Sequence, residues 1–311
     1  MECHICPHDC GVDRVSKLGT CRAPAQPKVS LASLHHHEEP ALSGAQGSGT
    51  IFFSHCNLAC VFCQNFDISQ LYEGRVISST RLVDIAFELK AQSAHNVNLV
   101  SPTPYSELIL EAMLPIKTEL AIPVVWNSNA YELVTVIRRL EPLVDVYLPD
   151  LKFFDPAVAK RYCGSADYFK YASRAVGEMW RQKREVRLQI AECRMQNETG
   201  QRANELHSRA EVMTQGVIIR HLVIPGQAED SKRVLKWIAD NLGPDVYISL
   251  MAQYTPVHRA REFREINRRL NRREYDQVRD YFYRLGFENG WVQELTAASS
   301  EYTPDFDFRG V

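Results

Sequence analysis

The chain has 311 residues, of which 45% are hydrophobic and 24% charged, and its formal net charge is −2 at pH 7. This length suits one large domain or two small ones, and the near-neutral charge argues against a protein that coats nucleic-acid phosphates. No apolar run reaches the roughly eighteen residues of a membrane-spanning helix. The polar, cysteine-rich start MECHICPHDC does not resemble a signal peptide. We therefore expect a cytoplasmic protein that binds neither membrane nor nucleic acid.

Seven of the nine cysteines form two groups, and the first group lies at the N-terminus. Cys3, Cys6, Cys10 and Cys21 place four thiols within nineteen residues. The segment 1–28 is too short to bury a core of its own, so a bound metal would stabilise it. Short loops favour a zinc site with four thiolates, and a second iron–sulfur cluster also satisfies the ligand count. Disulfides are disfavoured in a reducing cytoplasm.

The stretch LHHHEEP (34–40) carries three consecutive histidines and two glutamates. Neighbouring residues of an extended chain point to opposite faces, so these histidines are poor partners for a single metal ion. We interpret the stretch as a surface strand that leads into the glycine-rich SGAQGSGT (43–50).

The second cysteine group lies in HCNLACVFCQN (55–65), directly after the strand-like GTIFFS, and contains Cys56, Cys60 and Cys63. Three thiolates can hold three irons of a four-iron, four-sulfur (4Fe-4S) cluster and leave the fourth iron open to a small chelating molecule. The alternative is a zinc ion held by these cysteines and His55. Adjacent histidine and cysteine make an awkward chelate, so the spacing and the position after a buried strand favour the cluster.

This C-x3-C-x2-C loop, with Phe62 before the last cysteine, resembles the radical S-adenosylmethionine (SAM) superfamily. The wider string GSGTIFFSHCNLACVFCQN is similar to the pyruvate formate-lyase activating enzymes, in a branch with an N-terminal four-cysteine motif. The resemblance implies a 4Fe-4S cluster on Cys56, Cys60 and Cys63, with Phe62 beside the bound SAM. It also implies reductive cleavage of SAM to a 5′-deoxyadenosyl radical, with a reductant such as flavodoxin or ferredoxin. The expected substrate is a protein or peptide partner, and a small metabolite is the alternative.

From about residue 49, strand-like and helix-like patterns alternate six times. Strands are expected at 49–54, 97–102, 122–129, 145–153, 217–225 and 245–256, and helices at 79–95, 106–120, 131–143, 167–183 and 230–242. Six such units predict parallel strands joined by right-handed crossovers. A closed barrel needs eight, so we expect an open, partial (β/α)6 TIM-type barrel.

Polar residues follow several of these strands, at the edge where parallel α/β folds collect their chemistry. Ser101 and Thr103 come after the second strand, where related activating enzymes carry Gly-Gly-Glu. This chain has no carboxylate there, so contacts to the methionine amine must come from carbonyl and hydroxyl oxygens. The third strand ends in Asn127 and Ser128 and the fourth in Asp150. By resemblance, these three oxygen donors hold a monovalent cation beside the SAM carboxylate.

Three further residues complete the expected SAM site. Lys152 lies on the same strand face as Asp150, where it can meet the carboxylate or the ribose of SAM. Arg220 lies inside the apolar VIIRHLVIP. A buried arginine needs a partner, and the resemblance implies that this partner is SAM. Gln253 stands where relatives often carry a histidine, within reach of the adenosyl group, whereas His221 is expected to be a packed core residue.

Two regions fit the alternating pattern less well. We interpret the charged segment 184–216 as an exposed loop plus helix. Residues 258–285 contain two helical patterns, followed by GWVQEL and a polar tail. The expected domains are therefore a metal-binding segment at 1–28, a barrel at 29–260 and a C-terminal extension at 261–311. Outside enzyme chemistry, the same residues suit a zinc or electron-transfer protein on a barrel scaffold.

Overall fold

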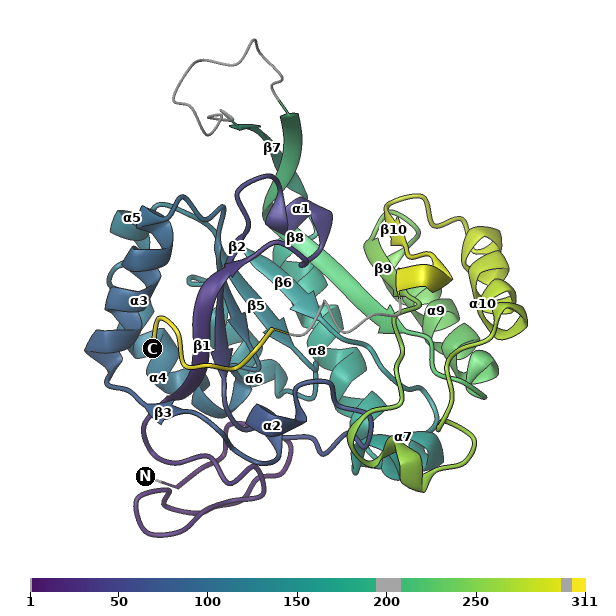
Figure 1. Cartoon of the computed structure of the whole chain (residues 1–311), viewed down its shortest axis with the longest axis horizontal. Coiled ribbons are helices and arrows are strands. Elements are labelled where there is room, and N and C mark those ends of the chain that lie inside the picture. The colour runs from purple at the N-terminus through teal and green to yellow at the C-terminus, as the bar shows by residue number, and fades with distance from the viewer. Residues whose placement is uncertain (1, 194–207, 298–303) are drawn as a thin grey trace.

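A single sheet organises the computed structural model, which describes residues 2–193, 208–297 and 304–311 (Figure 1). The strand order is β10-β9-β8-β6-β5-β4-β2-β1-β3, with β7 paired to β8 outside this path. The strands are β1 (Lys28–His35), β2 (Ser48–Phe53), β3 (Arg75–Val76), β4 (Val97–Val100), β5 (Val124–Ser128), β6 (Val146–Pro149), β7 (Arg187–Cys193), β8 (Ser208–Leu222), β9 (Tyr247–Met251) and β10 (Gly290–Val292).

Helices follow most of the parallel strands, as the alternating sequence pattern requires. They are α1 (Pro40–Ser43), α2 (Phe66–Ser69), α3 (Ser79–Ala91), α4 (Ser106–Met113), α5 (Lys117–Leu120), α6 (Val134–Leu140), α7 (Pro156–Cys163), α8 (Tyr168–Lys183), α9 (Ala228–Leu242) and α10 (Arg272–Arg284). Short 3-10 turns lie at Thr103–Tyr105, His258–Glu262 and Leu295–Ala297. None of the helices in the described ranges is long and apolar enough to cross a lipid bilayer.

The sheet is an open α/β barrel, which confirms the predicted fold class. Strands β2, β4, β5, β6, β8, β9 and β10 run parallel, while β1 and β3 add antiparallel pairs at one edge. In the described residues β10 is a seventh parallel strand, paired with β9 through Gly290–Val292. The predicted count of six was therefore one short, because three residues carry too little period-two pattern to be read as a strand.

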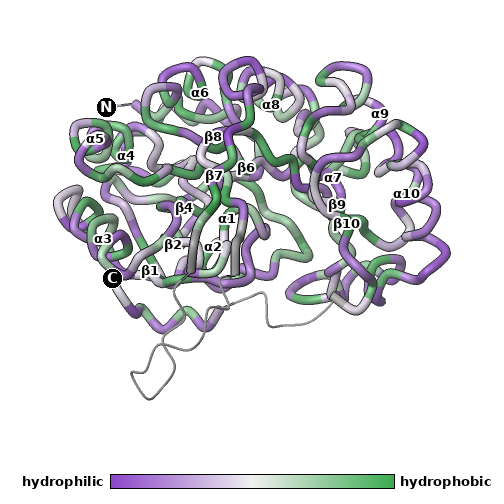
Figure 2. Tube along the Cα trace, turned by 90° about the horizontal axis from the view of Figure 1, so that it is seen from above, coloured by the Kyte–Doolittle hydropathy of each residue, from purple (hydrophilic) through white to green (hydrophobic). Residues whose placement is uncertain are grey.

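Helix α3 shows how the outer layer forms. The Ser78 side chain accepts a hydrogen bond from the backbone N–H of Arg81 and so caps the helix. Leu82, Ile85, Ala86 and Leu89 form its buried stripe, as predicted. The same arrangement of apolar faces against the sheet recurs in α4, α6, α8 and α9. In α10 the outward-facing turns are hydrophilic, as Figure 2 shows.

The described residues of 184–216 form the two antiparallel strands of a hairpin, so the predicted loop plus helix is wrong for these residues. Strand β7 pairs antiparallel with the first half of β8, and the hairpin extends from the barrel (Figure 1). Its apolar residues alternate with polar ones, and Leu188 and Ile190 are exposed while Val212 and Met213 are buried. This period-two pattern is typical of strands, but the high charge of the segment obscured it. Residues 194–207 lie outside the described ranges.

The stretch 34–40 was expected to form a surface strand. Only Leu34 and His35 lie in a strand, β1, and residues 36–40 do not continue it. Strand β1 pairs with β2 up to His35, and the chain then enters the concave side of the sheet. There α1 packs Ala41 and Leu42 against the inward side chains of Val125 and Leu148. An open barrel leaves the inner face of its sheet exposed to water unless another segment covers it, and α1 covers the amino-terminal part of that face.

Both chain ends are packed onto the barrel. The guanidinium of Arg14 donates to the carbonyl of Pro104, which anchors the N-terminal segment at the carboxyl ends of the strands. The C-terminal tail runs along β1, where the backbone N–H of Phe308 donates to the carbonyl of Ser30 at 3.1 Å. The cysteine-rich segment therefore lies at the same end of the sheet as the loop that follows β2 (Figure 1).

Candidate active site

The three-cysteine loop between β2 and α2 is held by the backbone of its neighbours. The N–H groups of Ala59 and Val61 donate to the carbonyls of Cys163 and Tyr162, at 3.2 and 2.9 Å. The N–H of His55, which has a positive φ of 72°, donates to the carbonyl of Ile68. These hydrogen bonds fix the loop against α2 and the end of α7, so the thiols are placed by the fold itself.

Cys60 is buried and Cys56 and Cys63 are partly buried, and Cys60 and Cys63 lie at the edge of a cavity. Burial raises the pKa of Cys56 to about 11 and raises the pKa of Cys60 and Cys63 as well. The side-chain amide of Asn129 donates to the sulfur of Cys56 at 3.2 Å. Since metal ligation needs thiolates, binding must displace protons from all three groups.

The zinc alternative needs a fourth ligand, for which the sequence suggested His55. His55, the fourth ligand of the zinc alternative, donates from Nδ1 to the carbonyl of Cys21 at 3.2 Å and stacks on Tyr72. Among the described residues, no three His, Cys, Asp or Glu side chains are gathered closely enough to hold one metal ion. Three thiols of one loop are the ligand set that the predicted cluster requires.

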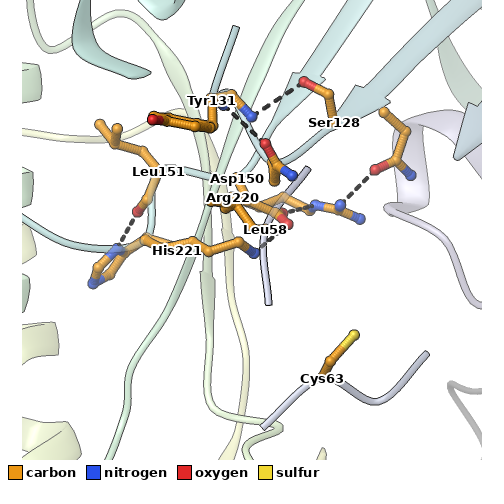
Figure 3. Close-up of polar contacts among 12 residues, drawn as sticks. Leu58, Cys63, Ser128, Tyr131, Asp150, Leu151, Arg220 and His221 are labelled. Atoms are coloured by element: carbon orange, nitrogen blue, oxygen red, sulfur yellow. Dashed lines mark hydrogen bonds and ion pairs between the residues drawn. The ribbon is translucent and has the colours of Figure 1, made fainter. Parts of the chain in front are cut away.

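A charged group lies across the cavity from the cysteines. Arg220, on β8, donates from Nε to Asp150 at 2.8 Å and from Nη2 to the amide oxygen of Asn127 at 2.6 Å (Figure 3). Lys152 donates to the other oxygen of Asp150 at 2.7 Å. Burial opposes ionisation of Asp150, but the charges of Arg220 and Lys152 hold its pKa below the usual value. The structure thus joins four predicted residues in one hydrogen-bonded group: Arg220, Asp150, Asn127 and Lys152.

Glu38 completes this group and was missed in the sequence. Its carboxylate accepts from Arg220 Nη1 at 3.1 Å, from Asn127 at 3.1 Å and from Asn98 at 2.9 Å. The next residue, Glu39, also lines the cavity, and burial raises its pKa to about 7. The sequence Glu-Glu-Pro could have indicated this role. Pro40 begins a helix and so leaves two acids at the N-terminus of that helix.

The cavity between these groups has a volume of about 450 Å³. Cys60, Cys63 and Phe62 line one side, and Gln253 lines the wall formed by β9. This size lies within the range of ordinary small-molecule sites. The further lining residues that sequence reasoning did not assign include His35, His37, Trp291 and Gln293.

Four predicted residues of the cluster and SAM site do not line this cavity: Cys56, which precedes the other two cysteines of its loop in the sequence, and Ser101, Thr103 and Ser128. The hydroxyls of Ser128 and Thr103 donate to the buried carboxylate of Glu132 at 2.6 and 2.9 Å, as does the indole N–H of Trp126. Ser101, with φ of 57°, instead uses its backbone N–H to reach the carbonyl of Asn127. Ser128 lies on the opposite face of β5 from Asn127, so the three oxygens predicted for a cation do not converge.

The N-terminal cysteines lie beside one another in a segment of turns. Cys3, Cys6 and Cys21 are buried, and Cys10 is partly exposed. Burial raises the pKa of Cys6 to about 12 and also raises that of Cys21. Arg14 donates from Nη2 to the sulfur of Cys3 at 3.1 Å and lies 3.9 Å from that of Cys21. A cation therefore stands beside two of the four sulfurs.

Comparison with known proteins identifies the family. A family model for the radical SAM superfamily matches residues 50–238, which is more than half of the chain. The uncharacterized protein MJ0674 of Methanocaldococcus jannaschii is 34% identical over 286 residues, covering 89% of this chain and 73% of the relative.

Solved structures show more distant matches. SuiB of Streptococcus suis bound to its precursor peptide SuiA gives a TM-score of 0.48 at 16% identity, covering 77% of this chain and 46% of that one. Methylornithine synthase (PylB) gives 0.44 at 14% identity, covering 73% and 59%. The chain thus spans about half the length of these solved structures.

Proposed function

Because the chain belongs to the radical SAM superfamily, which implies a 4Fe-4S cluster and SAM, we propose that it uses them to abstract hydrogen from a substrate. The observation that supports the proposal is the cavity itself: Cys60 and Cys63 of the three-cysteine loop line one side, and the charged group of Arg220, Asp150 and Lys152 lines the other. When bound, the cluster would supply one electron to SAM, whose carbon–sulfur bond then breaks to give methionine and a 5′-deoxyadenosyl radical. We infer this role for Cys56, Cys60 and Cys63.

The charged group is suited to the amino-acid end of SAM. Arg220 uses three of its five N–H groups on protein oxygens, so two remain for a carboxylate. Lys152 offers further donors to the same group or to the ribose. The carboxylates of Glu38 and Asp150 hold the guanidinium in place, and Phe62 and Gln253 are the proposed walls beside the adenosine.

For the substrate, we infer a protein or peptide partner, as in the activation of glycyl-radical enzymes. The support is the resemblance of the cysteine-loop string to the activating enzymes. A small polar metabolite is the second candidate, because Glu39 and the histidines at 35 and 37 add polar groups to the cavity wall. For the N-terminal cysteines, we propose a metal site of zinc or iron–sulfur type, and for the electron a flavodoxin or ferredoxin.

Anaerobic reconstitution with iron and sulfide, followed by reduction in the presence of SAM, tests the proposal. The expected product is 5′-deoxyadenosine, and Cys60→Ala should abolish it. Cys163→Ala is the matched control, because Cys163 is a buried thiol of the neighbouring helix α7 that donates to the carbonyl of Ala159. Failure of the reconstituted wild-type chain to form 5′-deoxyadenosine, or equal loss in both variants, would contradict the proposal.

A further inference from the structure

Glu38 and Glu39 are neighbours in the sequence but lie on opposite sides of Arg220. The carboxylate of Glu38 accepts from Arg220 and from Asn127 on β5, whereas the carboxyl of Glu39 lies beside the hydroxyl of Ser249 on β9. Strand β8, which carries Arg220, stands between β6 and β9 in the sheet. The group proposed for the SAM carboxylate is therefore on the β5–β6 side, and Glu39 belongs to the β9–β10 side.

The carboxyl of Glu39 is buried and has no protein cation of its own. The residue is only 8% exposed, yet it lines the cavity. Arg220, whose charge acts on it, forms its ion pairs with Glu38 and Asp150 instead. Within the described ranges, no lysine or arginine pairs with Glu39, and the hydroxyl of Ser249 makes no well-formed hydrogen bond. Because a buried carboxyl needs a partner, the cavity offers this one to a ligand.

The charges that line the cavity leave one negative charge unmatched. Asp150 and Glu38 carry two negative charges, and their ion pairs with Lys152 and Arg220 balance them with two positive ones. Ionised Glu39 adds a further negative charge on the same wall. An unpaired buried charge is costly, so a cationic ligand would be stabilised there.

Trp291 places an aromatic ring in the same part of the cavity. It lies on β10, where it pairs in register with Ser249, the residue whose hydroxyl lies beside Glu39. Trp291 also lines the cavity. The face of an indole attracts a cation within about 6 Å of the ring centre. A carboxylate and an indole on one wall therefore favour an organic ammonium group over a neutral or anionic one.

This part of the cavity lies deeper in the barrel than the cysteine loop. Gln64, the residue after Cys63, donates to the hydroxyl of Thr255 at 3.4 Å. Thr255 follows the end of β9 by four residues, whereas Ser249 precedes that end by two. The cysteine loop is thus at the mouth of the barrel and Glu39 is on its inner wall. A ligand that binds Glu39 and also reaches the cysteine loop must be elongated.

We propose that Glu39, Ser249 and Trp291 form a subsite for the ammonium end of an elongated substrate, whose other end points toward the three-cysteine loop. This assignment narrows the substrate of the proposed function, on which it rests, to molecules that carry an ammonium group. The lysine side chain of a peptide and a small free amine share this chemistry. Glu39 binds and orients the substrate, and no bond to the carboxyl forms or breaks.

Equilibrium dialysis of the full chain, reconstituted and supplied with SAM but no reductant, is the first test. The probes are radiolabelled pentylamine, which is protonated at pH 8, and the neutral pentan-1-ol of similar length. The wild-type protein is expected to bind pentylammonium at least about tenfold more tightly than pentan-1-ol. Equal affinities would overturn the proposal. This comparison uses the wild type alone, so it does not depend on whether a variant folds.

Variants then locate the bound ammonium. Glu39→Gln should lower the affinity for pentylammonium at least about tenfold and leave that for pentan-1-ol unchanged. Trp291→Leu should weaken pentylammonium binding severalfold. Glu111→Gln, at an exposed position on α4, is the matched control and should bind both probes as the wild type does. Equal pentylammonium affinities in wild type and Glu39→Gln would contradict the subsite.

Two further arms distinguish the sources of the ammonium group. SAM also carries one, but Glu39→Gln should bind SAM as the wild type does, and a tenfold loss would assign Glu39 to SAM and overturn the proposal. Nα-acetyl-lysine N-methylamide represents the peptide side chain. Tighter binding of this probe than of pentylamine would identify a peptide as the source, and the reverse order would identify a free amine, with the ammonium subsite supported in either case.

The subsite and the proposed function can fail separately. If the reconstituted wild-type chain forms 5′-deoxyadenosine but binds pentylammonium no better than pentan-1-ol, the subsite fails and the proposed function stands. If no reductant yields 5′-deoxyadenosine while pentylammonium binding still depends on Glu39, the proposed function fails and the ammonium site remains.

Discussion

The inner and outer faces of the sheet assign opposite roles to residues that are adjacent in the sequence. Arg220 points into the cavity and binds Asp150, whereas His221 points outward and donates from Nδ1 to the carbonyl of Leu151 at 2.7 Å (Figure 3). On β5, the side chain of Asn127 joins the inner charged group, while that of Ser128 turns outward. Neighbouring residues of a strand therefore have different roles here, because one side chain faces the cavity and the next faces the outer side of the sheet.

The polar groups of the two faces also differ in whether they can still bind a ligand. On the outer face, Glu132 is fully buried and accepts from Ser128, Trp126 and Thr103, so one residue of the loop between β5 and α6 satisfies all three donors. On the inner face, the charges of Arg220 are paired, but the group still lines the cavity. Outer polar residues should therefore affect stability, and inner ones ligand binding, and four predictions test this division.

The largest expected effect is on the outer face. Glu132→Leu leaves three buried donors without an acceptor, and each such donor costs about 1–3 kcal/mol, so the free energy of unfolding should fall by roughly 3 kcal/mol or more. Urea unfolding of the full chain checks this. Glu111→Leu, at an exposed position on α4, is the control and should change stability by less than about 0.5 kcal/mol. Similar losses of stability in both variants would contradict the role of Glu132 as the acceptor for three buried donors.

The second prediction concerns pH, and the two faces should respond in opposite directions. Burial lowers the pKa of His221, on the outer face, to about 4. Between this value and the unfolded value near 6.5, the unfolded chain binds a proton that the folded chain does not. Stability should therefore fall as pH decreases from 6.5 to 4, and His221→Gln should remove this loss. Urea unfolding at pH 5 and pH 7 measures the difference.

On the inner face, the sign is reversed. Burial raises the pKa of Glu39 to about 7, so the folded chain retains a proton that the unfolded chain releases above its own pKa near 4.5. Stability should fall as pH rises from 4.5 to 7, and above pH 7 Glu39→Gln should be more stable than the wild type by roughly 2–3 kcal/mol. The advantage should vanish near pH 4.5. A constant difference at all pH values would show that the carboxyl does not titrate in this way.

The third prediction moves from stability to SAM binding. Arg220→Lys keeps the positive charge but cannot reach Asp150, Glu38 and Asn127 at once, because lysine lacks the planar fork of arginine. We expect the affinity for SAM to fall about tenfold, or ~1.4 kcal/mol, in a titration of the reconstituted protein. His221→Gln, one residue further along β8, should bind SAM as the wild type does. Equal affinities in the two variants would contradict the proposed role of Arg220.

The order of the main parallel strands and their helices could be predicted from the sequence, but the side to which Ser128 and Thr103 point could not. The helix stripe of α3 and the strand that precedes the cysteine loop follow from local periodicity. Ser128 was expected to hold a cation beside SAM and Thr103 to contact its methionine amine, yet both donate to Glu132. Which of two neighbours points inward depends on the register of the sheet, and an isolated strand end does not reveal its register.

Glu38 shows a second limit. Glu38 lies more than a hundred residues from Asp150 and Arg220 in sequence, and only the return of the chain across the concave face brings the three together. Local patterns carry no information on that path. The placement of the N-terminal cysteines beside Cys56 has the same origin, since the contacts of His8 and His55 join distant segments.

The smallest expected effect compares neighbours on β5. Ser128→Ala removes one hydrogen bond to Glu132 and should lower the free energy of unfolding by about 1 kcal/mol, with SAM affinity unchanged. Asn127→Ala removes the amide that accepts from Arg220 and donates to Glu38. It should weaken SAM binding severalfold, because the guanidinium loses one of its three supports. Urea and SAM titrations of both variants measure the two effects. Weaker SAM binding in Ser128→Ala but not in Asn127→Ala would contradict the assignment of the inner and outer faces of β5.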